Sequence, residues 1–156
     1  MKKEHKHKIR VVSWILFCIY LVMMVYFLFF SEQLGRVPRD TYQYNLKPFA
    51  EIRRYINYAD RLGSFRVMLN LAGNVVCFMP FGFVIPVLAN RYRKLYKMVA
   101  LSFFASLLVE TIQLFSKLGS FDVDDIFLNT LGGLLGYIAF QIGNHILHIW
   151  NRQGKN

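Results

Sequence analysis

The strongest constraint on the fold is an apolar run near the start of the chain, Val11 to Phe30, which holds twenty residues and no charge. A helix needs about 20 such residues to cross the hydrocarbon core of a membrane. The run is too long for the apolar part of a signal peptide, and no small-residue cleavage site follows it. We therefore predict a membrane anchor that stays in the protein.

The composition favours a membrane protein over a soluble domain. Of the 156 residues, 55% are hydrophobic and 18% are charged, and the apolar residues fall in long runs. The net charge of +10 comes from basic residues that flank these runs, which suits contact with anionic lipid headgroups. We found no stacking platform or recognition helix for nucleic acid. We expect membrane lipids as partners and no binding of nucleic acid. The sequence leaves the oligomeric state open.

Three more apolar segments follow, so the predicted fold is an all-α integral membrane protein with four transmembrane helices in a single domain, 1–156. The predicted spans are 11–30, 67–90, 98–115 and 126–150. Of the 19 Lys and Arg residues, eleven lie in the two terminal segments and the loop 91–97, and eight in the other connections. Because basic residues favour the cytoplasmic side, we predict that both termini are cytoplasmic (N-in/C-in).

An amphipathic segment at the outer interface is predicted between the first two spans, from about Phe49 to Leu62. Ile52 and Tyr55 lie on its apolar side, whereas Arg53 and Arg54 lie on the other. The two arginines are candidates to bind an anionic headgroup or pyrophosphate. The alternative is ordinary anchoring of the segment at the lipid surface.

Polar side chains lie just inside three of the predicted spans, at helical spacing. They are Asn70 and Asn74 in the second span, Glu110 and Gln113 in the third, and Asp122, Asp125 and Asn129 at the start of the fourth. In the predicted topology, those within the spans lie roughly 5 to 10 Å inside the outer boundary. An outward-opening polar pocket is the simplest arrangement that satisfies all of them.

A structural explanation competes with the functional one. The amides could be hydrogen-bond glue between helices, worth about 0.6 kcal/mol per contact. Hydrogen bonding between helices explains Glu110 less well, because the insertion of a carboxylate into the membrane is unfavourable by on the order of 3 kcal/mol. Asp122 and Asp125 share one helix face, so one is expected to cap the fourth helix and the other to face the pocket. Asp124 points elsewhere and is expected to be solvated.

Proline and glycine residues predict how the second and fourth spans pack. Pro80 and Pro86 interrupt the hydrogen-bond ladder, which predicts a kink or a break near 78–82. Gly132 and Gly136 form a GxxxG pattern, which is typical of close helix packing within the chain and less often of a dimer face. No metal site is predicted, because the two cysteines lie in apolar spans and the histidines do not form a ligand set.

Four motifs together resemble the VanZ-like family. They are NLKPF (45–49), GNVVCFMPFGF (73–83), ETIQ (110–113) and FDVDDIFLNTLGGLLGY (121–137), in the order and spacing of that family. The match defines an expected core of about 45–140, and the first helix carries no motif. The family is named for a membrane protein that accompanies glycopeptide-resistance genes and is associated with low-level teicoplanin resistance. The resemblance therefore implies a multi-pass protein of the bacterial cytoplasmic membrane and a resistance phenotype, but no reaction.

Two classes of function follow. In the first, the protein binds or shields a lipid-linked or cell-wall component at the outer face, so that glycopeptide and lipoglycopeptide antibiotics act less well. In the second, it is a membrane enzyme that modifies an envelope lipid or glycan carrier. Glu110 and Asp122 or Asp125 would then be acid and base, or ligands of a divalent cation. The sequence has no nucleophile elbow, so these three residues are candidates for catalysis without an assigned role.

Overall fold

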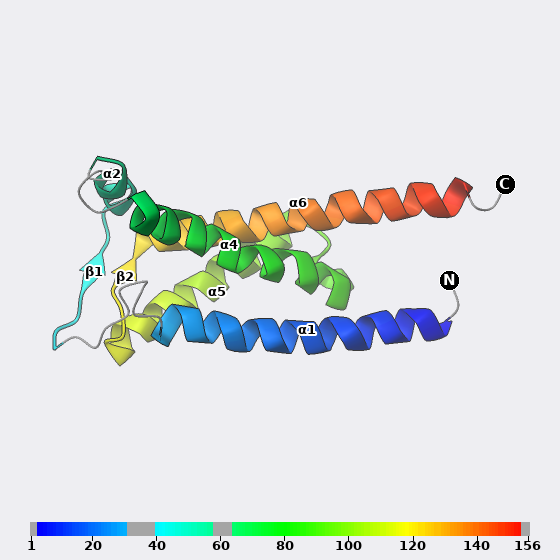
Figure 1. Cartoon of the computed structure of the whole chain (residues 1–156), viewed down its shortest axis with the longest axis horizontal. Coiled ribbons are helices and arrows are strands. Elements are labelled where there is room, and N and C mark those ends of the chain that lie inside the picture. The colour runs from blue at the N-terminus through cyan, green and yellow to red at the C-terminus, as the bar shows by residue number, and fades with distance from the viewer. Residues whose placement is uncertain (1–2, 31–39, 58–63, 154–156) are drawn as a thin grey trace.

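The computed structural model describes residues 3–30, 40–57 and 64–153, and most of them are helical (Figure 1). The elements in chain order are α1 (Lys3–Phe30), β1 (Tyr44–Asn45), α2 (Ala50–Asn57), α4 (Ser64–Leu88), η2 (Asn90–Tyr92), α5 (Leu95–Ser116), β2 (Phe121–Asp122) and α6 (Val123–Gln153).

Four of these helices are long and apolar enough to cross a membrane, which confirms the predicted all-α membrane fold. The apolar windows are Arg10–Phe29 in α1, Asn70–Leu88 in α4, Leu95–Ser116 in α5 and Val123–Trp150 in α6. α1 begins and α6 ends at one end of the bundle, called here the terminal end (Figure 1). β1, β2 and α2 lie at the opposite end, called here the polar end. With an even number of spans, the start of α1 and the end of α6 must lie at the same end of the bundle. The side of the membrane that each end faces stays a prediction.

The closest helix pair is α4 and α6, because glycines let the two backbones touch. A Cβ atom at Gly132 would collide with the backbone of Val75, and one at Gly136 with the backbone of Met79. Gly82 on α4 lies in the same way against the backbone of α6. The GxxxG pattern therefore packs helices within the chain, as predicted.

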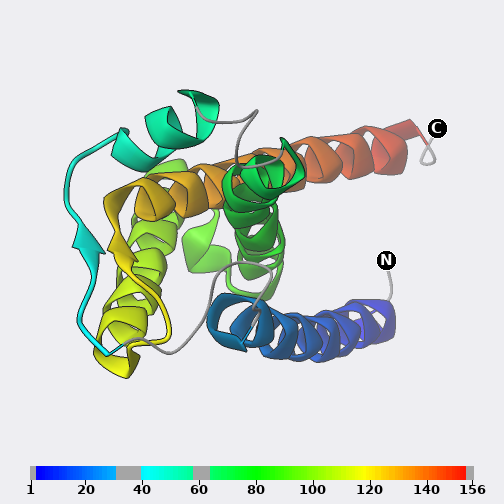
Figure 2. The same ribbon diagram turned by 60° about the vertical axis from the view of Figure 1, so that its left-hand side comes forward.

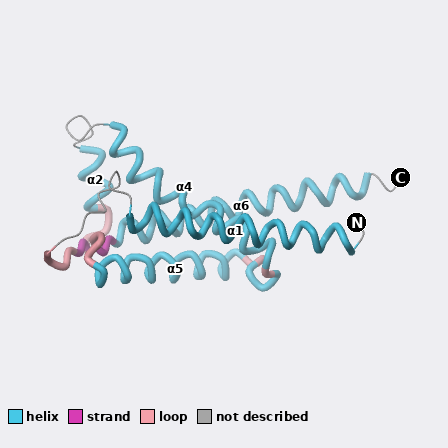
Figure 3. The backbone as a smooth tube through the Cα atoms, turned by 60° about the horizontal axis from the view of Figure 1, so that its bottom comes forward, coloured by secondary structure: helices cyan, strands magenta, loops and turns pink. Residues whose placement is uncertain are grey.

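Of the predicted kink or break near 78–82, the structure shows no break, because α4 is one continuous helix that contains both Pro80 and Pro86. It curves along its length instead (Figure 3). Packing of its glycine against α6 and a hydrogen bond from Arg93 Nε to the Pro86 carbonyl, at 3.1 Å, support the helix near its prolines. The Pro86 carbonyl, close to the end of the helix, therefore has a donor from outside the helix.

α1 contacts α4 near the terminal end and α5 near the polar end. Arg10 donates to the carbonyl of Leu88 at 3.2 Å, and the Tyr20 hydroxyl donates to the carbonyl of Cys77 at 2.7 Å. Gln113 on α5 then donates to the carbonyl of Leu28 at 2.7 Å. α1 is therefore part of the bundle, although it carries none of the sequence motifs.

The connections at the polar end form a short parallel pairing that the sequence analysis did not predict. β1 pairs with β2, with Tyr44 opposite Phe121 and Asn45 opposite Asp122. The amphipathic segment predicted from Phe49 to Leu62 is observed as α2, and 58–63 lie outside the described residues. The pairing joins the connection that precedes α2 to the start of α6 (Figure 2).

Candidate functional site

One face of α5 is polar, and it turns into the bundle. Ser102, Ser106, Glu110 and Gln113 follow one another at helical spacing, and each is at most 1% exposed. Leu108, on the opposite face, is 60% exposed and faces the surroundings. Glu110 and Gln113 therefore point into the bundle and not toward lipid.

Glu110 supports the start of α6. Its Oε2 atom accepts a hydrogen bond from the backbone N–H of Asp122 at 2.9 Å. This N–H comes just before the first turn of α6, where backbone donors have no partner within the helix. Glu110 therefore joins α5 to the beginning of α6, and its carboxylate has a structural task.

Asp122 is the residue that caps α6. Its Oδ1 accepts the backbone N–H of Asp124 at 2.8 Å, and the side-chain amide of Asn45 donates to both of its oxygens at 3.3 and 3.4 Å. Burial raises the pKa of Asp122 from 3.8 to about 6, and the two hydrogen bonds oppose this shift only in part. Of the two aspartates predicted to share the roles of cap and pocket residue, Asp122 is the cap.

The raised pKa of Asp122 predicts a pH-dependent stability. The folded protein binds this proton more tightly than the unfolded chain, so the free energy of unfolding is expected to fall as pH rises through about 4 to 6. Lowering the pH from about 7 to about 5 should therefore raise the melting temperature of the purified protein. Asp122→Asn should lose this part of the pH dependence. An unchanged pH profile in that variant would show that another group is responsible.

Asp125 joins α6 to α4 and is only partly buried. Its Oδ1 accepts a hydrogen bond from the Asn74 side-chain amide at 2.5 Å. Tyr55 on α2 lies close enough for the Asp125 charge to help raise its pKa, after the larger effects of burial and of Glu51. Asn70 is one helical turn before Asn74 and is also partly exposed. Asp125, Asn74, Asn70 and Tyr55 are called here the Asp125 site.

Asp124 is a correction to the sequence analysis, because it is buried rather than solvated. It is 1% exposed, and its two oxygens accept the backbone N–H groups of Phe49, Glu51 and Ile52 at 2.5, 2.9 and 3.2 Å. Asp124 thus caps the N-terminus of α2 from a distant part of the chain. The sequence held one indication that α2 needs a cap from elsewhere in the chain. No Ser, Thr, Asp or Asn lies directly before Ala50, where a local cap would be.

The cap holds α2 in a defined position beside α6. Phe49 has a φ of 62°, in the left-handed region that non-glycine residues rarely adopt. Its ring stacks on Phe127 of α6, with a centroid distance of 5.9 Å and an interplanar angle of 6°. In the NLKPF motif, Asn45 is therefore hydrogen-bonded to Asp122 and the residues after it form a turn. At the end of the motif, Asp124 binds the N–H of Phe49 and fixes the start of α2.

The remaining two predicted pocket residues make hydrogen bonds inside the bundle. Gln113 binds the Leu28 carbonyl of α1, and the Asn129 amide donates to Ser106 Oγ at 2.9 Å. The side chains of both Gln113 and Asn129 are fully buried. These contacts are those expected of hydrogen bonds that hold helices together, whereas three residues of the Asp125 site, namely Asp125, Asn70 and Tyr55, are partly exposed.

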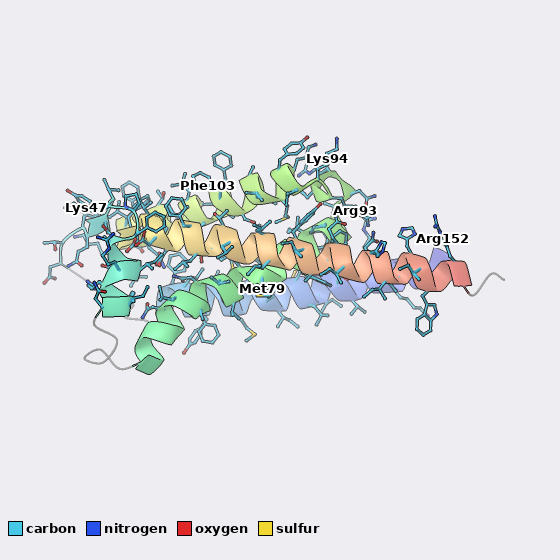
Figure 4. All side chains as sticks on the ribbon, turned by 90° about the horizontal axis from the view of Figure 1, so that it is seen from above. Lys47, Met79, Arg93, Lys94, Phe103 and Arg152 are labelled. Carbon is cyan, nitrogen blue, oxygen red and sulfur yellow. The ribbon has the colours of Figure 1, made fainter. Side chains whose placement is uncertain are left out.

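The two candidate arginines lie on α2, exposed at the polar end. Arg54 pairs with Glu51 at 2.8 Å, and its guanidinium lies 5.4 Å from the centre of the Tyr55 ring. Arg53 is exposed. Lys47 lies at the same end, whereas Arg93, Lys94 and Arg152 lie toward the terminal end (Figure 4).

Two cavities lie away from the carboxylates. One of about 340 Å³ is a groove between α1 and α4, and one of about 660 Å³ follows the last turns of α6. In the described parts of the chain, no three His, Cys, Asp or Glu side chains come together in a group able to hold a metal ion. The predicted polar residues thus gather at one end of the bundle, but most of them are occupied by hydrogen bonds.

Four apolar helices and a polar cluster at one end define a multi-pass α-helical membrane protein. Its family follows from comparison with known proteins. A family model described as VanZ/LLP1 matches residues 17–144, and Protein VanZ of Enterococcus faecium is 30% identical over 138 residues, 86% of this chain and 77% of that protein. The chain belongs to the VanZ/LLP1 family, which confirms the resemblance found in the motifs. No solved structure gives a significant match.

Proposed function

We propose that this protein lies in the bacterial cytoplasmic membrane with its polar end outside. There it binds and shields a lipid-linked or cell-wall component, which lowers susceptibility to glycopeptide and lipoglycopeptide antibiotics such as teicoplanin. Membership of the VanZ/LLP1 family supports the phenotype. The observation that carries the proposal of binding is how Glu110, Asp122, Asp124 and Asp125, the carboxylates of α5, β2 and α6, are buried and hydrogen-bonded.

Three of these carboxylates accept backbone N–H groups and are at least 94% buried: Glu110, Asp122 and Asp124. Asp125 differs, because it is partly exposed and is bound by a side-chain amide. The acid–base pair considered in the sequence, Glu110 with Asp122 or Asp125, would need both groups to reach the substrate, whereas recognition by hydrogen bonds needs one charged acceptor with polar neighbours. The arrangement therefore favours binding over chemistry.

The chemistry of the Asp125 site indicates the class of ligand. A carboxylate, two amides and a phenol can hydrogen-bond the hydroxyl and amide groups of a glycan or peptide. Arg53 and Arg54, on the helix that carries Tyr55, would attract the phosphate groups of a lipid-linked precursor. A ligand with both kinds of group fits this end of the protein.

The orientation can be tested by cysteine labelling. A cysteine at Ser120, at the polar end, is expected to react with a membrane-impermeant thiol reagent added to intact cells. A cysteine at Arg93, near the terminal end, is expected to react only after permeabilisation. The reason is the excess of basic residues at the terminal end. The reverse pattern would put the Asp125 site in the cytoplasm and exclude direct protection at the cell surface.

The proposed role of the arginines is tested by a double substitution. Arg53→Gln with Arg54→Gln should raise the amount of fluorescent teicoplanin bound to cells and lower the resistance, because the phosphate group loses its cations. Arg91→Gln with Lys94→Gln is the matched control, since it removes two positive charges from the other end. If both double variants change antibiotic binding equally, the arginines only anchor the protein at the membrane.

A further inference from the structure

α5 and α6 contact each other through small and polar side chains near the middle of their apolar windows. Ser102 on α5 lies against Gly133 on α6, because a Cβ atom at Gly133 would collide with the Ser102 Oγ atom. One turn nearer the polar end, the Asn129 side-chain amide donates to Ser106 Oγ at 2.9 Å. The apolar window of α5 is Leu95–Ser116, so Ser102 and Ser106 lie on the two sides of its midpoint.

Two polar atoms at this contact have no hydrogen-bond partner among the residues that the structure describes. They are the hydroxyl oxygen of Ser102 and the side-chain carbonyl oxygen of Asn129, Oδ1. Both side chains are 0% exposed, so neither solvent nor lipid headgroups reach them from outside the bundle. Turning the Asn129 amide over would only leave its nitrogen without a partner in place of its oxygen. A buried polar atom without a hydrogen bond is unfavourable, and the surrounding hydrocarbon offers it no partner.

The spacing of these two atoms along the bundle suits one water molecule. Gly133, which lies beside Ser102, follows Asn129 by four residues, so the two levels are about one helical turn, or 5.4 Å, apart. A water that makes one hydrogen bond of about 2.8 Å on each side spans up to about 5.6 Å. Asn129 Oδ1 can only accept, whereas the Ser102 hydroxyl can donate or accept. A water that donates to Asn129 can therefore pair with Ser102 in either sense.

A divalent cation fits these atoms less well than water. An ion such as Ca²⁺ takes about six to eight oxygen ligands and favours carboxylates, whereas a buried water makes about three hydrogen bonds. The two atoms without partners belong to neutral side chains. The carboxylate on the same face of α5, Glu110, lies one turn beyond Ser106 and accepts the backbone N–H of Asp122.

Apolar side chains close this contact toward the terminal end. Met98, one turn before Ser102, is 0% exposed and packs with Tyr137 and Phe140 of α6 in an apolar cluster. Leu101 packs against the same cluster. A ligand held at Ser102 is therefore internal to the bundle and does not lie on a polar path between its two ends.

We infer that a water molecule is bound between α5 and α6, where it bridges Ser102 and Asn129 near the middle of the membrane. Buried polar groups that a protein cannot pair are typically satisfied by such internal waters. The water adds a second hydrogen-bonded connection to the one between Asn129 and Ser106. The site exists whichever side of the membrane the polar end faces, and whether or not the protein binds an envelope component.

Solid-state NMR of the full-length protein in deuterated lipid bilayers tests whether water touches Asn129. Magnetisation is transferred from water protons to isotope-labelled asparagine, and the Asn129 side chain is assigned through its backbone resonances. We expect a water signal at the Asn129 amide despite its complete burial. Ser102→Ala should lose this signal, because the water loses one of its side-chain partners. Thr111→Val is the matched control and should keep it, since the Thr111 hydroxyl already donates to the Leu107 carbonyl at 2.7 Å.

A double-mutant cycle in the folding equilibrium tests the bridge independently. Since Ser102 and Asn129 act on the same water, Ser102→Ala should shift the equilibrium at least about twofold less in the Asn129→Leu background than in the unaltered protein. Additive effects, or the lack of a water signal at Asn129 in the unaltered protein, would overturn the inference. A water signal that persists in Ser102→Ala would also overturn the bridge. A melting temperature raised by Na⁺ but not by choline, with the effect lost in Asn129→Leu, would assign the site to a cation instead.

Discussion

Replacing Asp124 by alanine is expected to release α2 from the bundle and to abolish the proposed protection against antibiotics. The carboxylate accepts three backbone N–H groups at the start of α2 and is almost completely buried. α2 buries none of its own side chains fully, and besides the cap it is held by the stacking of Phe49 on Phe127. Loss of the cap should destabilise α2 in its docked position by about 2 kcal/mol. This corresponds to roughly a 30-fold change in the equilibrium between docked and released α2.

Hydrogen exchange of the purified protein measures this effect directly. In Asp124→Ala, the backbone amides of α2 should lose about 30-fold in protection, while those in the centre of α5 keep theirs. Asp124→Asn should have an intermediate effect, because one amide oxygen can still accept. Asp40→Asn is a control for loss of one negative charge at an exposed position of the same end. Normal protection of α2 in the alanine variant would show that the stacking of Phe49 holds it alone.

The importance of Asp124 was not predictable from the helical pattern of α6. That pattern shows which residues share a face, but not which other element covers each face. Asp122 and Asp125 lie on the face predicted to be functional, and Asp124 lies on another that α2 happens to cover. The position of α2 depends on the pairing of β1 with β2, and two residues per strand carry no periodicity that a sequence can reveal.

Other parts of the structure were predictable because their signals are local. Each membrane span is a long apolar run, and the observed helices begin and end within a few residues of the predicted spans, except that α1 begins earlier. The glycine pattern predicted the contact of α4 with α6, since only residues without a side chain allow backbones so close. The expectation that Asp122 or Asp125 caps the fourth helix is also confirmed, and the cap is Asp122.

The sequence made Glu110 a candidate for catalysis, and the structure adds a structural role for its carboxylate. A carboxylate in a membrane helix is a candidate functional residue, because its burial is unfavourable without a partner. The Oε2 atom of Glu110 accepts a hydrogen bond from the backbone N–H of Asp122. A neutral oxygen can accept the same hydrogen bond, so Glu110→Gln is expected to keep both the fold and the protection.

Asp125→Asn is expected to have the opposite outcome, with a normal fold and no protection. The asparagine oxygen can still accept from the Asn74 amide, so the contact between α4 and α6 is kept. The negative charge of the Asp125 site is lost, and hydrogen bonds to a charged group are worth about 1 kcal/mol more than neutral ones. With two such bonds to a ligand, binding should weaken about tenfold or more.

The measurement that separates these two carboxylates is antibiotic susceptibility at matched levels of protein in the membrane. Asp125→Asn should be as susceptible as cells without the protein, and Glu110→Gln should resemble the unaltered protein. Loss of protection in Glu110→Gln with full protection in Asp125→Asn would assign the functional charge to Glu110. Because both substitutions keep the volume and one acceptor oxygen for the hydrogen bond seen in the structure, a difference between them at matched protein levels reports on the charge more than on the fold.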